Sequence, residues 1–173
     1  MARRNVRIVA AVCAAASVFT LTACGSTTTA DKAKAVATAA PAGSAVRDGK
    51  FEVQVLDIAK ARQASSPDGN QFMIAKAQGE FIILTLNVKN IGDEQQSFFT
   101  DNQKLIDANG KEYGSSSEAD MYLNSGGAGS FTDINPGNSI QVRVAFDVPS
   151  GTVPKALEVH DSMLSGGSVV ALY

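Results

Sequence analysis

Apolar and polar side chains alternate with a period of two through most of the chain from Gly49 onward. The clearest stretch is 81–90, where four aliphatic residues share one side: Ile82, Leu84, Leu86 and Val88. Successive side chains of an extended chain point to opposite faces, so this alternation predicts strands with one buried face. The same pattern predicts strands at 51–55, 72–77, 81–90, 104–107, 111–113, 139–148, 157–160 and 169–172.

Turn-forming residues separate these predicted strands. Asn109-Gly110 is the strongest hairpin signal, because both residues tolerate positive φ. Pro149 ends the strand at 139–148, because proline has no N–H to donate. The Gly/Ser-rich stretch 114–130 is expected to be the main irregular loop, and no segment shows sustained helical periodicity. About seven short strands predict an all-β domain over 49–173, with two antiparallel sheets packed face to face.

The first residues of the chain have the pattern of an export signal. Met1–Arg7 carries three arginines, and the following residues 8–21 have no charge and are too few to span a bilayer comfortably. Leu21-Thr22-Ala23-Cys24 resembles the lipobox of lipoproteins cut by signal peptidase II. That resemblance implies a signal peptide at 1–23 and a diacylglycerol thioether on Cys24. General secretion is the default route, with twin-arginine export as the alternative.

A low-complexity segment follows the predicted lipidated cysteine. Residues 24–48 consist largely of Ala, Thr, Ser and Gly, which cannot bury enough surface to offset the entropy of ordering. We therefore expect a flexible tether that holds the domain near the membrane, on its outer, extracytoplasmic face. The attachment would come from the lipid on Cys24 alone.

Composition and charge exclude several classes of partner. Three of the 15 basic residues lie in the leader, which leaves 12 against 17 acidic residues and a net charge near −5. An acidic domain without clustered Lys or Arg is a poor nucleic-acid binder. No Gly-rich phosphate motif follows a strand and opens a helix, so nucleotide binding is not expected. Cys13 and Cys24 are the two cysteines, and neither remains as a free thiol in the predicted mature chain.

Few residues offer catalytic or metal-binding chemistry. His160 is the one histidine, and with Leu157 and Val159 facing the core it is expected to point to solvent. Neighbouring strand residues such as Asp161 and Ser162 point to opposite faces, so a hydrolase site is not expected. The stretch 107–112 superficially resembles a calcium loop, but its glycine falls at the wrong position and a hairpin explains it. No metal, cofactor or enzymatic activity is therefore expected.

Three ordered motifs resemble a bacterial family of unknown function, whose members are mostly secreted proteins and lipoproteins. They are similar to the immunogenic extracellular proteins of actinobacteria. The motifs are Gly79-x-Phe81 with Asn90-x-Gly92, then Leu105, Asp107, Gly110 and Tyr113, and finally Pro136-Gly137 with Phe146, Val148 and Pro149. The resemblance covers roughly 49–160 and implies an immunoglobulin-like sandwich outside the cytoplasm, without implying an activity. Gln103 departs from it, since the family often has an aromatic residue there, and this suggests local repacking.

Three functions remain open at this point. The first is an interaction module, with contact residues Met121, Tyr122 and Phe131 in or near the loop 114–130, because aromatic residues dominate interface energetics. Its partner would be an envelope or extracellular protein. The second is a structural envelope-maintenance accessory without a discrete ligand. The third and least favoured is an enzyme.

Overall fold

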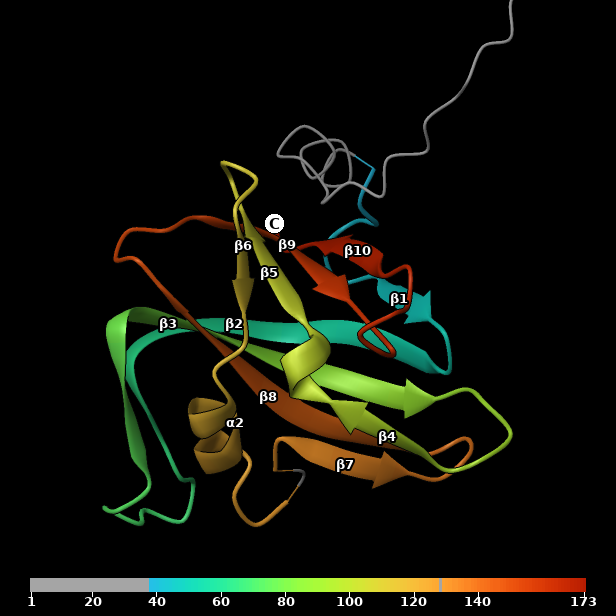
Figure 1. Ribbon diagram of the computed structural model, residues 1–173, viewed down its shortest axis with the longest axis horizontal. Coiled ribbons are helices and arrows are strands. Elements are labelled where there is room, and N and C mark those ends of the chain that lie inside the picture. The colour runs from blue at the N-terminus through green and yellow to red at the C-terminus, as the bar shows by residue number, and fades with distance from the viewer. Residues whose placement is uncertain (1–37, 128) are drawn as a thin grey trace, which may run out of the picture.

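The computed structural model describes residues 38–127 and 129–173, and antiparallel sheets account for most of them (Figure 1). The predicted signal peptide, Cys24 and the tether up to residue 37 lie outside the described residues. The strands are β1 (Ala45–Asp48), β2 (Phe51–Ser65), β3 (Ile74–Asn90), β4 (Gln96–Phe99), β5 (Lys104–Asp107), β6 (Glu112–Gly114), β7 (Phe131–Ile134), β8 (Ser139–Val148), β9 (Pro154–Val159) and β10 (Ser168–Ala171). Two short helices accompany them, the 3₁₀ helix η1 (Thr100–Asn102) and the α-helix α2 (Ser117–Leu123).

Two four-stranded sheets form the sandwich, with strand orders β1-β2-β3-β8 and β10-β9-β5-β6, and β4 and β7 pair separately. The predicted apolar faces of β3 and β8 point inward, and the core between the sheets contains Leu84, Val144, Phe146 and Leu157. Phe51 packs edge-on against Phe98 with ring centroids 5.3 Å apart. The prediction of an antiparallel, immunoglobulin-like β-sandwich is confirmed, with ten strands among the described residues rather than about seven.

The longest hairpin contains one strand that the sequence pattern divided into two. The predicted strands 72–77 and 81–90 belong to a single strand, β3, which pairs with an equally extended β2. Register shifts between Val55 and Asp57, and between Ala61 and Gln63, interrupt the alternation of the hairpin, which hides its continuity. Phe72 lies at the hairpin tip and is 83% exposed, so its assignment to a strand is wrong.

The folded domain begins earlier than residue 49. Residues 45–48, predicted as tether, form β1 and pair with residues 51–54 of β2, and Val46 is buried. Ala40 bridges Val170 of β10. Backbone hydrogen bonds to an existing strand hold this segment, and such bonds require little from side chains, so low complexity did not prevent ordering.

The stretch 114–130 is not wholly irregular, because it contains α2. Ser116 caps the helix by accepting a hydrogen bond from the Ala119 N–H, 3.5 Å between heavy atoms. Ala119 and Leu123, one turn apart, join a second apolar cluster with Phe81 and Ala145. A helix of only seven residues is too short to give a sustained periodic signal. The distal part of the long β2–β3 hairpin contributes Ala64 and Ala75 to this cluster, which fixes α2 between the hairpin and β8.

Candidate functional site

The three predicted contact residues lie on two elements and differ in exposure. Met121 lies on α2 and is 46% exposed, while Tyr122 is half-buried against the second apolar cluster. The Tyr122 hydroxyl donates to the Glu118 carboxylate at 3.4 Å, within the same helix. Phe131 begins β7 and is 61% exposed. Tyr122 therefore mainly packs α2 against the second apolar cluster, whereas Met121 and Phe131 present apolar surface to solvent.

Phe131 has an aromatic neighbour that the sequence analysis did not select. Phe99 of β4 lies directly opposite Phe131 in the β4–β7 pair, and the two rings stack with centroids 5.9 Å apart and an interplanar angle of 25°. Phe99 is 44% exposed. Stacking shields part of each ring from water, yet both keep a large exposed apolar area. Phe99 was missed because its pairing with Phe131 depends on a strand register that alternation does not specify.

Helix α2 closes the free edge of β8. The Ala145 N–H donates to Oδ1 of Asp120 at 2.7 Å, and the Ala145 carbonyl accepts from the Ser116 N–H at 2.7 Å. Two residues along the same edge, the Arg143 N–H donates to Oδ1 of Asn124 at 2.8 Å and the Arg143 carbonyl accepts from its Nδ2 at 2.8 Å. These groups take the place of a neighbouring strand, so α2 protects an edge that could otherwise pair with another chain.

The carboxyl of Asp120 is the most perturbed titratable group of this region. Its side chain is buried, and burial raises its pKa to about 7, against the lowering effect of the Thr100 hydroxyl and the Ala145 N–H. Repulsion from the nearby Asp101 carboxylate also contributes to this raised pKa. Among the described residues, Oδ2 of Asp120 has no hydrogen-bond partner. The protonated form of Asp120 is therefore favoured until the pH reaches neutrality.

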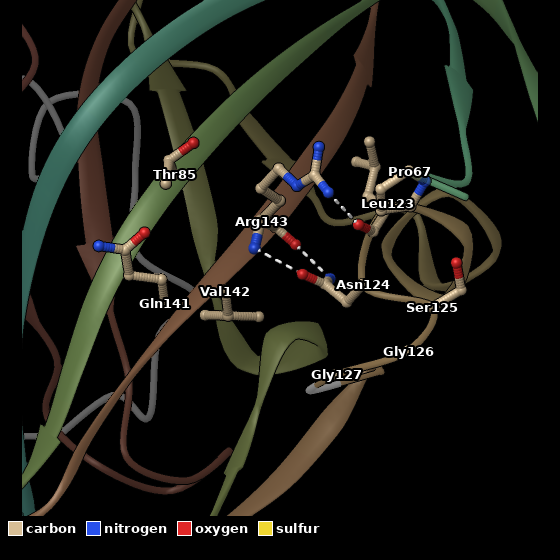
Figure 2. Close-up of a pocket in the computed structure, with 10 residues that line it drawn as sticks. All are labelled: Pro67, Thr85, Leu123, Asn124, Ser125, Gly126, Gly127, Gln141, Val142 and Arg143. Atoms are coloured by element: carbon tan, nitrogen blue, oxygen red, sulfur yellow. Dashed lines mark hydrogen bonds between the residues drawn. The ribbon is translucent and has the colours of Figure 1, made fainter. Parts of the chain in front are cut away.

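A pocket of about 390 Å³ opens between the C-terminal end of α2, the tip of the β2–β3 hairpin and the outer face of the first sheet (Figure 2). Its lining residues are Pro67, Thr85, Leu123, Asn124, Ser125, Gly126, Gly127, Gln141, Val142 and Arg143. Figure 2 shows the Arg143 side chain lying across this space, with its guanidinium directed to the Leu123 carbonyl. Ser66 and Ser125 contact each other through their hydroxyls and close the wall between hairpin and helix.

His160 is half-buried, so the expectation that it points to solvent is wrong. The segment after β9 turns back over the imidazole, and a Cβ built at Gly167 would lie 2.7 Å from its Cε1. Nδ1 lies 3.2 Å from the Ser165 hydroxyl, and Nε2 lies 3.7 Å from a Glu158 carboxylate oxygen. Ser165 also donates to the Ser162 carbonyl, and 3.7 Å exceeds hydrogen-bonding distance, so no oriented catalytic triad results.

The stretch that resembles a calcium loop forms a hairpin turn. Oδ1 of Asp107 accepts from the N–H groups of Asn109 and Lys111 at 2.8 and 2.9 Å, and Oδ2 accepts from the Tyr113 hydroxyl at 3.1 Å. Burial alone would raise the pKa of Asp107, but these hydrogen bonds outweigh it and hold the pKa below its usual value. Its oxygens are thus occupied by the turn, and the described residues contain no cluster of three metal-ligating side chains.

Gln103, the departure from the family pattern, is a buried amide that joins two segments. Its Nε2 donates to the carbonyls of Phe99 and His160 at 2.9 and 3.0 Å, and its Oε1 accepts from the His160 N–H at 3.0 Å. An aromatic side chain could not satisfy these three backbone groups. Gln103 therefore fixes the strand that carries the exposed Phe99 relative to the end of β9.

The comparisons with known proteins agree with this architecture. The model of a domain of unknown function (DUF4352) matches residues 40–169. The yjhA protein of Bacillus subtilis has a similar structure, with a TM-score of 0.53, 13% sequence identity and coverage of 78% of this chain and 99% of that chain. MPT63, a secreted protein of Mycobacterium tuberculosis, gives a TM-score of 0.49 at 17% identity, covering 78% of this chain and 98% of its own.

An uncharacterized β-sandwich protein of Clostridium difficile likewise gives a TM-score of 0.49 at 14% identity, with coverage of 79% of this chain and 95% of that chain. No curated protein matches the chain. Within the part of the chain that the structure describes, no helix is long and apolar enough to cross a membrane. The likeness to the yjhA protein concerns the fold alone.

Proposed function

The chain belongs to the DUF4352 family of domains of unknown function. From its own residues we propose that the protein is a lipid-anchored binding module outside the cytoplasm. It holds its β-sandwich near the membrane and contacts an envelope or extracellular protein. It acts by binding and not as an enzyme.

The sequence of the leader supports the location. A basic n-region, an uncharged apolar stretch and the lipobox at Leu21–Cys24 together form a lipoprotein signal. Ala40 already pairs with the sandwich, so the tether predicted to run from 24 to 48 is shortened to residues 24–39 at most. A coil of this length spans roughly 20 Å, which keeps the contact surface close to the membrane.

The stacked pair of Phe99 and Phe131 is the observation that carries the binding function. Large aromatic side chains with exposed faces are unfavourable in water and are typical anchors of protein interfaces. The two rings come from different strands, so the sheet register holds them in place before any partner arrives. A preformed anchor loses little conformational entropy on binding, so this pair is suited to a protein partner with an apolar recess.

The contact prediction is tested by crosslinking in living cells followed by mass spectrometry. Replacing Phe131 with Ser removes the more exposed ring and should reduce the yield of a specific crosslinked partner by about tenfold or more, as for an interface hot spot. Phe72→Ser is the matched control, because Phe72 is also exposed at the hairpin tip but forms no aromatic pair among the described residues. Its crosslinks should match those of the wild type.

Two outcomes would contradict this proposal. If Phe131→Ser and Phe72→Ser reduced crosslinking equally, general surface hydrophobicity would account for the contact. If the wild type crosslinked only to abundant envelope neighbours, the protein would instead be an envelope-maintenance accessory without a discrete partner.

The lipid anchor is tested separately by feeding cells an alkyne-bearing fatty acid. The wild-type protein should carry the label, and Cys24→Ser should carry none, because the predicted thioether needs the cysteine sulfur. Tryptic mass spectrometry should find the mature wild-type chain beginning at Cys24 with a diacylglyceryl mass. A mature chain that begins elsewhere, or equal labelling of the variant, would show that the protein is exported without this anchor.

A further inference from the structure

Arg143 has more hydrogen-bonding capacity than the fold uses. A guanidinium has five N–H donors, and among the described contacts this one donates to the Leu123 carbonyl at the end of α2. Arg143 is half-buried, and it has no acidic partner among the ion pairs of the described residues. A cationic side chain near the last carbonyls of a helix stabilises the helix, yet this role leaves its other donors free.

Two further polar side chains line the same pocket without internal partners. Thr85 of β3 lies directly opposite Arg143 in the β3–β8 register, and Gln141 lies two residues before Arg143 on β8, so all three belong to one face of the sheet. Neither the Thr85 hydroxyl nor the Gln141 amide makes a side-chain hydrogen bond among the described residues. Figure 2 shows both residues on the sheet side of the pocket: the Arg143 side chain lies between Thr85 and the helix end, and the Gln141 amide points away from the helix.

We propose that this pocket is a binding subsite for a carboxylate, with Arg143 as its cationic anchor and Thr85 as an additional hydrogen-bond donor. A guanidinium presents two parallel N–H groups that match the two oxygens of a carboxylate. Pro67 and Leu123 supply apolar wall beside these donors, so the ligand carries a small apolar group next to its carboxylate. A peptide C-terminus and a free small carboxylic acid share this chemistry.

The surrounding charges disfavour a doubly charged ligand more than a singly charged one. Asp57 of β2 lies opposite Thr85 in the register, on the side away from Arg143, and Asp68 stands at the hairpin tip next to Pro67. Both aspartates repel an anionic ligand, and this repulsion grows with the charge of the ligand, so it disfavours a dianion such as a phosphate monoester more than a single carboxylate. This site is separate from the aromatic pair of the proposed function and does not depend on it.

Titration of the full-length protein, solubilised in detergent, with N-acetyl-trialanine tests the proposal by NMR. The Arg143 Nε–H and the Gly126 and Gly127 amides should shift saturably, because these groups line the pocket. The C-terminal amide of the same peptide should bind about tenfold more weakly or worse, since it lacks the charge. Acetate is the third probe: saturation by acetate alone assigns the site to small carboxylates, and saturation by the peptide only assigns it to chain ends.

Variants separate binding at the site from general charge effects. Arg143→Gln should abolish the saturable shifts, and Thr85→Val, which leaves the helix contact of Arg143 untouched, should weaken them several-fold. Lys155→Gln removes an equal charge from an exposed position on β9 and should bind as the wild type does. Equal binding of peptide acid and peptide amide, equal loss in Arg143→Gln and Lys155→Gln, or shifts that never saturate would each overturn the carboxylate subsite.

Discussion

Replacing Asp120 with Asn should remove most of the pH dependence of stability between pH 3.8 and about 7. In the folded protein burial raises the pKa of Asp120 from 3.8 to about 7. Within this window the folded state binds more protons than the unfolded state, so the free energy of unfolding of the wild type falls as the pH rises. The full shift corresponds to a loss on the order of 4 kcal/mol.

Asparagine resembles the protonated aspartate, which explains the expected direction. Its side-chain oxygen can still accept from the Ala145 N–H, as Oδ1 of Asp120 does at 2.7 Å. Its amide group would replace Oδ2, which has no hydrogen-bond partner among the described residues. We expect the variant to be less stable than the wild type by about 1 kcal/mol at acid pH, and more stable by about 3 kcal/mol above neutrality.

Urea unfolding measured over this pH range checks the prediction. Asp57→Asn is the charge control, because it removes the same kind of carboxyl from an exposed position. Asp107 acts in the opposite sense and in a different range: its lowered pKa gives stability that is present above 3.8 and is lost as the pH falls through its folded pKa. A parallel pH profile for wild type and Asp120→Asn would mean that Asp120 is charged in the folded protein.

Replacing Asn90 with Ala should destabilise the domain by about 3 kcal/mol. Asn90 is fully buried at the end of β3, where its Nδ2 donates to the carbonyls of Glu94 and Ile134, both at 2.7 Å. Its Oδ1 accepts from the Gly92 N–H at 2.8 Å. Alanine would leave these backbone groups without a partner, and the buried Ile134 carbonyl would lose most, because water cannot reach it easily.

The same denaturation experiment tests Asn90, with Asn87→Ala as the matched control. Asn87 lies on the same strand, but it is half-buried and its side chain makes no hydrogen bond among the described residues. The control should change stability by about 1 kcal/mol or less, because asparagine and alanine both have a low strand preference. Equal losses for the two variants would show that the Asn90 bonds contribute little beyond strand propensity.

The family motifs now have physical explanations that involve the fold. Asn90 and Gly92 form the turn after β3, and Asp107 with Tyr113 closes the β5–β6 hairpin. A Cβ built at Gly79 would meet the Val148 carbonyl at 2.2 Å, so this glycine permits a close approach of two backbones. These residues specify the sandwich, which is consistent with a resemblance that implied a fold and no activity.

Strand identity was predictable because alternation is a local property. Each residue of β3 and β8 faces inward or outward according to its position in its own strand, so the buried sets around Leu84 and Val144 follow from the sequence alone. The alternation pattern failed at three places. The β2–β3 register shifts interrupt it, and β1 lies in a low-complexity segment that is held by backbone hydrogen bonds. Helix α2 is too short to show a period.

The candidate sites were less predictable, because each combines segments that are distant in the sequence. Phe131 was selected for its residue type, but its stacking on Phe99 follows from the β4–β7 register. Met121 and Tyr122 were predicted together as contact residues. They are consecutive on α2, where neighbouring side chains point in different directions, so Met121 is exposed and Tyr122 packs against the second apolar cluster. Arg143 carried no signal at all, since its pocket exists only where the helix end meets the β2–β3 hairpin.

The sequence by itself determined the class of fold and the inward faces of its main strands, because each depends on the order of neighbouring residues. The export signal is a prediction of the same local kind. The tertiary structure decided the other features. Helix α2 hydrogen-bonds to the edge of β8, Asp120 is buried, and Thr85 and Arg143 lie on the same face of the sheet. These features depend on which strands pair, in which register and under which loop. Alternation is satisfied equally well by many pairings, and only packing of the whole domain selects one.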